Sequence, residues 1–95
     1  MEGQALLDFL VELAQEAGVQ VRVIPRYAAE GDPPPRSGIC RIRGVPWLLL
    51  ASGEPLEDRI EAAATAVRVH AREALEERYL PPAVRERLDS PRGSS

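Results

Sequence analysis

The chain has 95 residues, a hydrophobic fraction of 44% and a formal net charge of −3. This length supports one domain with one modest core, and the apolar fraction excludes disorder of the whole chain. Its basic residues are all arginine, but the acidic balance disfavours a phosphate-binding or nucleic-acid-binding protein. The only cysteine, Cys40, and the only histidine, His70, exclude an internal disulfide and the common structural zinc modules.

The apolar segments are short. The longest unbroken run covers residues 45–51, far fewer than the roughly 20 residues that span a bilayer. The first four residues, Met1 to Gln4, lack the basic start and apolar core of a signal peptide. We therefore expect a cytoplasmic protein with no membrane contact.

The first predicted element is an amphipathic helix that ends at Gly18, a residue suited to the left-handed position after a helix. Its apolar stripe has intervals of three and four residues and comprises Leu6, Phe9, Leu10, Leu13, Ala14 and Ala17. Alternation of valine with Gln20 and Arg22 then predicts a strand over residues 19–24. The joint is a single glycine, so this strand folds back over its own helix.

A loop is predicted over residues 26–36, because the three prolines at 33–35 disfavour both helix and strand. A hairpin follows, with strands over residues 39–43 and 45–51 and a tight turn at Arg43-Gly44, where glycine supplies a positive φ. The second hairpin strand is apolar on both faces, which is typical of a central strand. Arginines in the first hairpin strand indicate a charged edge.

Pairing the hairpin strands sorts their side chains into two sets. One set is wholly apolar and comprises Cys40, Ile42, Val45, Trp47 and Leu49. The other set comprises Ile39, Arg41, Leu48 and Leu50. We expect the apolar set to face the helices and the second set to form an uncovered sheet face.

A long helix is predicted from residue 56 to about residue 78, beginning beside Pro55. Its apolar seam is Leu56, Ile60, Ala63, Ala64, Val67, Ala71, Ala74 and Leu75. A short last helix is expected over residues 82–88, with Val84 and Leu88 folding back. Residues 90–95 form a polar tail that we expect to be disordered.

The sequence predicts no catalytic, cofactor-binding or metal-ligating residue. Cys40 lies in the middle of a strand and is interpreted as a small core residue. His70 lies among Arg68, Arg72 and Glu73, which indicates a solvated helix face. The carboxylates of the long helix alternate with arginines, so ordinary surface ion pairs explain them.

Three stretches of the sequence carry a resemblance to a known family. The run of residues 38–44, the start of the long helix at residues 57–61 and the closing stretch 80–85 resemble a family of small uncharacterised bacterial proteins with no established activity. The order of elements also resembles the front of zincin-like metallopeptidases of the ImmA/IrrE type. The helix that carries HExxH in those enzymes corresponds here to residues 60–66, with alanines where the zinc ligands would stand, so peptidase activity is not implied.

We therefore predict a single α+β domain over residues 1–89, of order α-β-β-β-α. It has a three-stranded sheet, two long helices on one face and a short C-terminal helix. An uncovered apolar face usually marks an interface, so we expect a non-catalytic protein–protein interaction module, most simply a homodimer that buries that face or pairs by strand edges. The predicted interface residues are Ile39, Arg41, Leu48 and Leu50. Two alternatives remain open: a degenerate or metal-dependent hydrolase-like enzyme that uses His70, and an RNA-binding sheet that uses Arg41 and Arg43.

Overall fold

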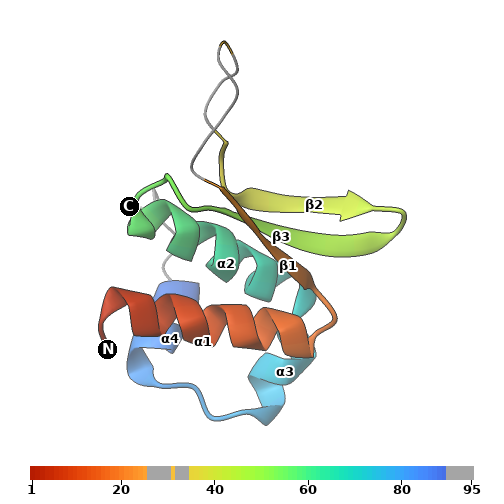
Figure 1. The fold of residues 1–95 in the computed structure, drawn as a ribbon. Helices are drawn as coiled ribbons and strands as arrows, with labels where there is room; N and C mark the ends of the chain where they lie inside the picture. Colours follow the sequence, from red (N-terminus) through yellow and green to blue (C-terminus); the bar gives the residue numbers. More distant parts are fainter. Residues whose placement is uncertain (26–30, 32–34, 90–95) are drawn as a thin grey trace.

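A computed structural model describes residues 1–25, 31 and 35–89 of the chain (Figure 1). In chain order the elements are α1 (Gly3–Glu16), β1 (Gln20–Ile24), β2 (Gly38–Ile42), β3 (Val45–Ala51), α2 (Leu56–His70), α3 (Arg72–Glu77) and α4 (Pro82–Asp89). This order confirms the predicted α+β class. The predicted tail, residues 90–95, and most of the predicted proline loop lie outside the described residues. Among the described residues no helix is both long and apolar enough to cross a membrane.

The three strands form one mixed sheet in the order β1-β3-β2. β3 is the central strand, parallel to β1 and antiparallel to β2, and β2 is an edge, as predicted. The hairpin turn is the predicted pair, with φ of 51° at Arg43 and 80° at Gly44. Positive φ at both turn residues matches the twist of the two strands, as in type I′ hairpins.

Both long helical segments cover one face of the sheet, and the core lies between the layers (Figure 1). α1 begins where the carboxylate of Glu2 accepts a hydrogen bond of 2.8 Å from the Ala5 amide, and it is followed by Gly18 at φ 89°. Its buried stripe includes Leu7, which the predicted stripe omitted. α2 packs its alanine-rich seam against α1 and β3, because side chains this small let the backbones approach closely.

The predicted assignment of the two sheet faces is wrong. Leu48 and Leu50 are 0% and 6% exposed and belong to the core beneath the helices. Ile39 and Arg41 share that helix-side face but lie at the sheet edge, where both are exposed. Cys40, expected in the core, is exposed instead.

The physical reason lies in β1. Its register sets Arg22 beside Leu49 and Val21 beside Leu48. Turning the Leu49 face toward the helices would bury the guanidinium of Arg22 in an apolar layer, which is costly without a paired carboxylate. The chain therefore turns Val21 of β1, which is partly buried, toward the helices together with Leu48, and Leu49 stays on the solvent side.

The predicted long helix is interrupted at Ala71, where φ is −116° and ψ is 28°. α3 then leaves the axis of α2 and ends close to the C-terminal half of α1. There Arg78 pairs with Glu16 at 2.5 Å and lies 5.1 Å from the centroid of the Phe9 ring. The break therefore lets the end of this segment attach to the first helix.

α4 is the predicted short helix, and Val84 and Leu88 are buried as expected. Arg87 attaches this helix to α2. Its guanidinium pairs with Glu57 at 2.5 Å and with Glu61 at 3.1 Å, and its side chain is only 16% exposed. Glu61 also pairs with Arg68 at 3.0 Å, so two arginines share this carboxylate between the two helices.

Candidate interaction surface

The sheet face away from the helices is apolar and lacks a covering layer among the described residues. We call it the open face; it comprises Gln20, Arg22, Ile24, Cys40, Ile42, Val45, Trp47 and Leu49. Ile42 is 49% exposed and Val45 is 39% exposed, while Trp47 and Leu49 are half-buried. Exposed apolar side chains that adjoin one another on a small domain usually mark a contact surface.

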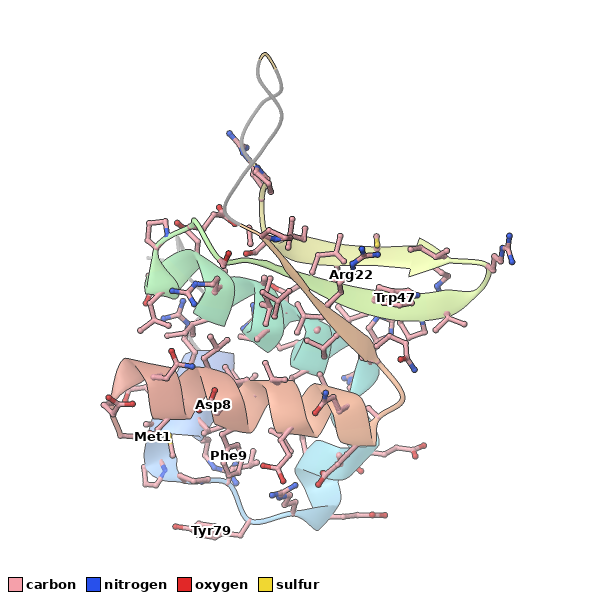
Figure 2. The ribbon with its side chains drawn as sticks, in the orientation of Figure 1. Met1, Asp8, Phe9, Arg22, Trp47 and Tyr79 are labelled. Atoms are coloured by element: carbon pink, nitrogen blue, oxygen red, sulfur yellow. The ribbon has the colours of Figure 1, made fainter. Side chains whose placement is uncertain are left out.

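A hollow of about 310 Å³ lies in the open face, lined by Arg22, Ile24, Pro25, Ile42, Trp47 and Leu49. Figure 2 shows Arg22 and Trp47 near one another on the sheet, on the side remote from Asp8 and Phe9 of α1. The Trp47 ring offers a broad apolar surface, and Arg22 adds a fixed positive charge beside it. The hollow can therefore accept an apolar group next to an anionic one.

The described acidic side chains are concentrated in the helical layer. Residues 19–25 and 35–53, which make up the sheet and its turns, contain four arginines and no carboxylate: Arg22, Arg36, Arg41 and Arg43. Among the described acidic residues, only Glu2 and Glu54 lie outside the helices. The overall charge of −3 thus conceals a basic sheet layer, so net charge alone does not describe the open face.

The outer edge of β2 is the second part of this surface. In a two-residue hairpin the residues beside the turn, Ile42 and Val45, exchange hydrogen bonds, and bonded pairs then alternate along the strands. The backbone N–H and C=O groups of Ile39 and Arg41 therefore point away from β3, toward an edge at which no further strand pairs among the described residues. An edge of this kind can pair with a further strand.

A groove runs beside this edge on the helix side. We call it the β2–α2 groove; its volume is about 290 Å³ and it is lined by Arg36, Ser37, Gly38, Ile39, Glu54, Asp58, Glu61, Ala62 and Thr65. Ser37 closes one end, because its amide donates to the Glu54 carboxylate and its hydroxyl accepts from the Ala51 amide at 2.8 Å. Three carboxylates and one guanidinium line this groove, and one of the carboxylates, Glu61, is paired with Arg68 and Arg87.

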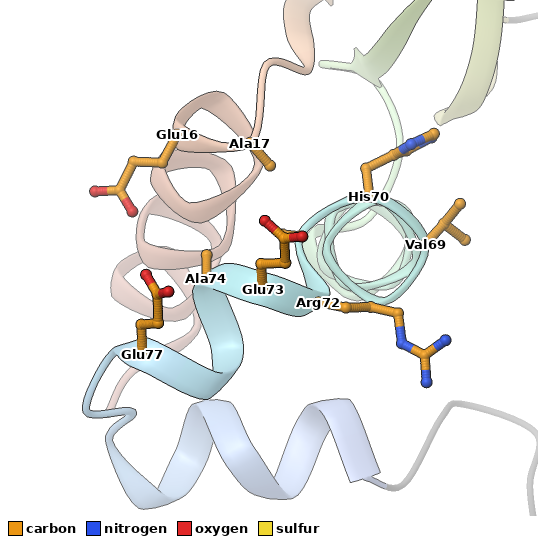
Figure 3. A pocket seen from close by; sticks show the side chains of 9 residues that line it. Glu16, Ala17, Val69, His70, Arg72, Glu73, Ala74 and Glu77 are labelled. Atoms are coloured by element: carbon orange, nitrogen blue, oxygen red, sulfur yellow. The ribbon is translucent and has the colours of Figure 1, made fainter.

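His70 lies in a different groove, of about 560 Å³, where α2 meets α3 and the end of α1 (Figure 3). Glu16, Glu73 and Glu77 line the same groove. In Figure 3 the imidazole points away from these carboxylates. Over residues 1–25, 31 and 35–89 no group of three histidine, cysteine or acidic side chains is placed to hold a metal ion.

The four predicted interface residues have different exposure in the structure. Ile39 and Arg41 lie at the exposed edge of β2, whereas Leu48 and Leu50 are buried and offer no surface. Sequence reasoning missed Arg22 and Ile24, which complete the open face. The signal for them was present in the alternation of β1, whose polar residues identify the solvent side of the sheet. Comparisons with family models, with curated proteins and with solved structures found no match.

Proposed function

We propose that this chain is a small non-catalytic protein–protein interaction module whose contact surface is the open face. The observation that carries the proposal is the uncovered apolar hollow around Trp47 in a layer that contains no carboxylate. Arg22 at its rim favours an anionic group beside the apolar one. The partner that fits is a protein segment that combines apolar side chains with aspartate or glutamate.

The size of the open face supports a short segment rather than a whole globular surface. Strands of 5 and 7 residues with a rise of about 3.3 Å and a spacing of about 4.8 Å cover roughly 300 Å². A stable interface between globular partners buries about 800 Å² on each side. Two sheets joined side by side along β2 would offer such a segment one continuous open face of twice the size.

For that reason the module is proposed to act as a homodimer with its sheets side by side. The resemblance to small bacterial proteins supports action in a bacterial cytoplasm. Neither proposal needs a cofactor or a metal ion.

Selection of displayed peptides tests the open face directly. A random 12-residue library is selected on the wild-type protein and, in parallel, on Leu49→Lys, which places a cation on the apolar face while leaving the core unchanged. We expect sequences with mixed apolar and acidic residues to be enriched on the wild type alone. Synthetic versions should then change the fluorescence of Trp47, the only tryptophan. Equal enrichment on both proteins, or none, would refute the proposal.

One observation favours a second candidate, an RNA-binding sheet. Arg22 and Trp47 share the open face, and an aromatic ring with a neighbouring arginine can stack an unpaired base. The predicted contribution of Arg41 is weakened, since it lies on the helix side of β2. Fluorescence anisotropy with a labelled 12-nucleotide single-stranded RNA distinguishes the two candidates. Binding that weakens steeply as salt increases would support RNA, and no binding at low salt would end that candidate.

A further inference from the structure

The β2–α2 groove and Arg41 are complementary in charge and shape. The groove has an apolar wall formed by Ile39 and Ala62 and a rim that carries the carboxylates of Asp58 and Glu54. Such a site suits a side chain with an apolar stem and a cationic head, which describes arginine. Arg41 lies on the same helix-side face of the same edge strand and is exposed.

We propose that two copies of this chain pair antiparallel along β2, with Cys40 at the two-fold axis, so that each Arg41 enters the β2–α2 groove of the other copy. This inference rests on the proposed homodimer and names its contact. In this register Ile39 of one copy and Arg41 of the other form a hydrogen-bonded pair. The two-fold axis generates a second, identical pair from Arg41 of the first copy and Ile39 of the second. Arg41 of each copy then lies directly beside Ile39 of the other, at the acidic groove.

The outward backbone groups of β2 allow two other symmetric registers, and both should be less stable than the one centred on Cys40. Centring the pair on Arg41 opposes two arginines directly, and like charges at that position destabilise a sheet. Centring it on Ile39 requires the Ser37 amide as a donor, but that amide already donates to Glu54. The register centred on Cys40 is also the one that pairs all five residues of β2.

Cys40 makes this register measurable. At the two-fold axis the Cys40 pair is a non-hydrogen-bonded pair, with Cα atoms about 4.5 Å apart, inside the range that a disulfide needs. Both side chains lie on the open face, where Cys40 is exposed. Copper–phenanthroline can join them: the two thiols lose two protons and two electrons, dioxygen takes up the electrons, and one S–S bond forms.

The control moves the thiol along the same face. In Cys40→Ser/Ile42→Cys the new thiol faces Gly38 of the other copy, so the two thiols are separated by four residues, or roughly 14 Å along the strand. We expect the wild type to form a disulfide-linked dimer within minutes and the shifted variant to remain uncrosslinked. Crosslinking of the shifted variant in preference to the wild type would overturn the register.

Sedimentation tests the dimer and the Arg41 contact separately from the disulfide. The reduced wild type should sediment as a dimer at micromolar concentration. Arg41→Glu should raise the dissociation constant at least about tenfold, because it places a carboxylate against an acidic groove. Arg85→Glu, the same charge change at an exposed site on α4, should leave it unchanged.

The outcomes separate the two levels of proposal. A wild type that is monomeric at these concentrations overturns the homodimer and this inference, while the peptide selection on Leu49→Lys still decides the open face. A dimer that is insensitive to Arg41→Glu, or that resists crosslinking at Cys40, overturns this inference and leaves the homodimer standing.

Discussion

Two neighbouring leucines of β3 offer a direct test of which sheet face is buried. Leu48 is 0% exposed and packs in the core, whereas Leu49 lies half-buried in the open-face hollow. Truncation of a fully buried leucine to alanine typically costs about 2.7–5.0 kcal/mol, through lost transfer free energy and the cavity left behind. At Leu49 solvent can fill the space, so Leu49→Ala should cost less than about 1 kcal/mol.

The assay is urea unfolding followed by far-ultraviolet circular dichroism at one fixed protein concentration. With an m-value of about 1.5 kcal/mol/M, typical of a small domain, a loss of 3 kcal/mol lowers the unfolding midpoint by about 2 M. A chain of this size has roughly 5–14 kcal/mol of total stability, so Leu48→Ala can still fold. The two substitutions are chemically identical and one residue apart, so each is the control for the other. If Leu49→Ala lowered the midpoint as much as Leu48→Ala, the face assignment given above would be wrong.

Three further predictions concern the turn, the helix pairing and the attachment of the last helix, each measured as the free energy of unfolding in urea. Gly44→Ala should cost about 1–2 kcal/mol, because φ is 80° there. The control, Gly38→Ala, should change stability by under about 0.5 kcal/mol, since an added Cβ meets no atom within 4 Å. Equal effects of the two substitutions would contradict the turn assignment. Ala63→Leu should cost about 1–3 kcal/mol, since Ala63 is fully buried and overpacking forces the helices apart; an unchanged midpoint would show space that the structure lacks. Arg87→Met keeps the apolar stem of the side chain but loses the ion pair with Glu61. The free energy of unfolding should fall by about 1 kcal/mol at low salt and by less in 1 M NaCl. A decrease that does not depend on salt would point to lost packing instead.

Local patterns in the sequence were sufficient for the elements and for the central place of β3. The single glycine after α1, the Arg43-Gly44 turn and the doubly apolar strand each depend on backbone geometry or on alternation over a few residues. The membership of the two side-chain sets on the hairpin was correct for the same reason. A strand alternates with a period of two, so pairing across the turn leaves no freedom in the sets.

The sequence alone did not decide which set is buried, because each set contains apolar side chains that could fill a core. The decision comes from the parallel pairing of β1 with β3, a contact between segments far apart in the chain that places Arg22 beside Leu49. Burying that guanidinium costs more than leaving Trp47 and Leu49 half-exposed. The candidate surface therefore moved to the opposite face of the sheet, and Arg22 joined it.

The break at Ala71 has the same origin. No glycine or proline marks it, and the apolar seam continues through it. The contacts of Arg78 with Glu16 and Phe9 exist only once α1 and α3 meet in space. The sequence by itself thus determined the elements, the hairpin register and the α+β class, because these depend on neighbouring residues. The tertiary structure decided the buried face, the helix break and the position of the candidate surface, because these depend on where charged side chains remain in water once distant segments pack.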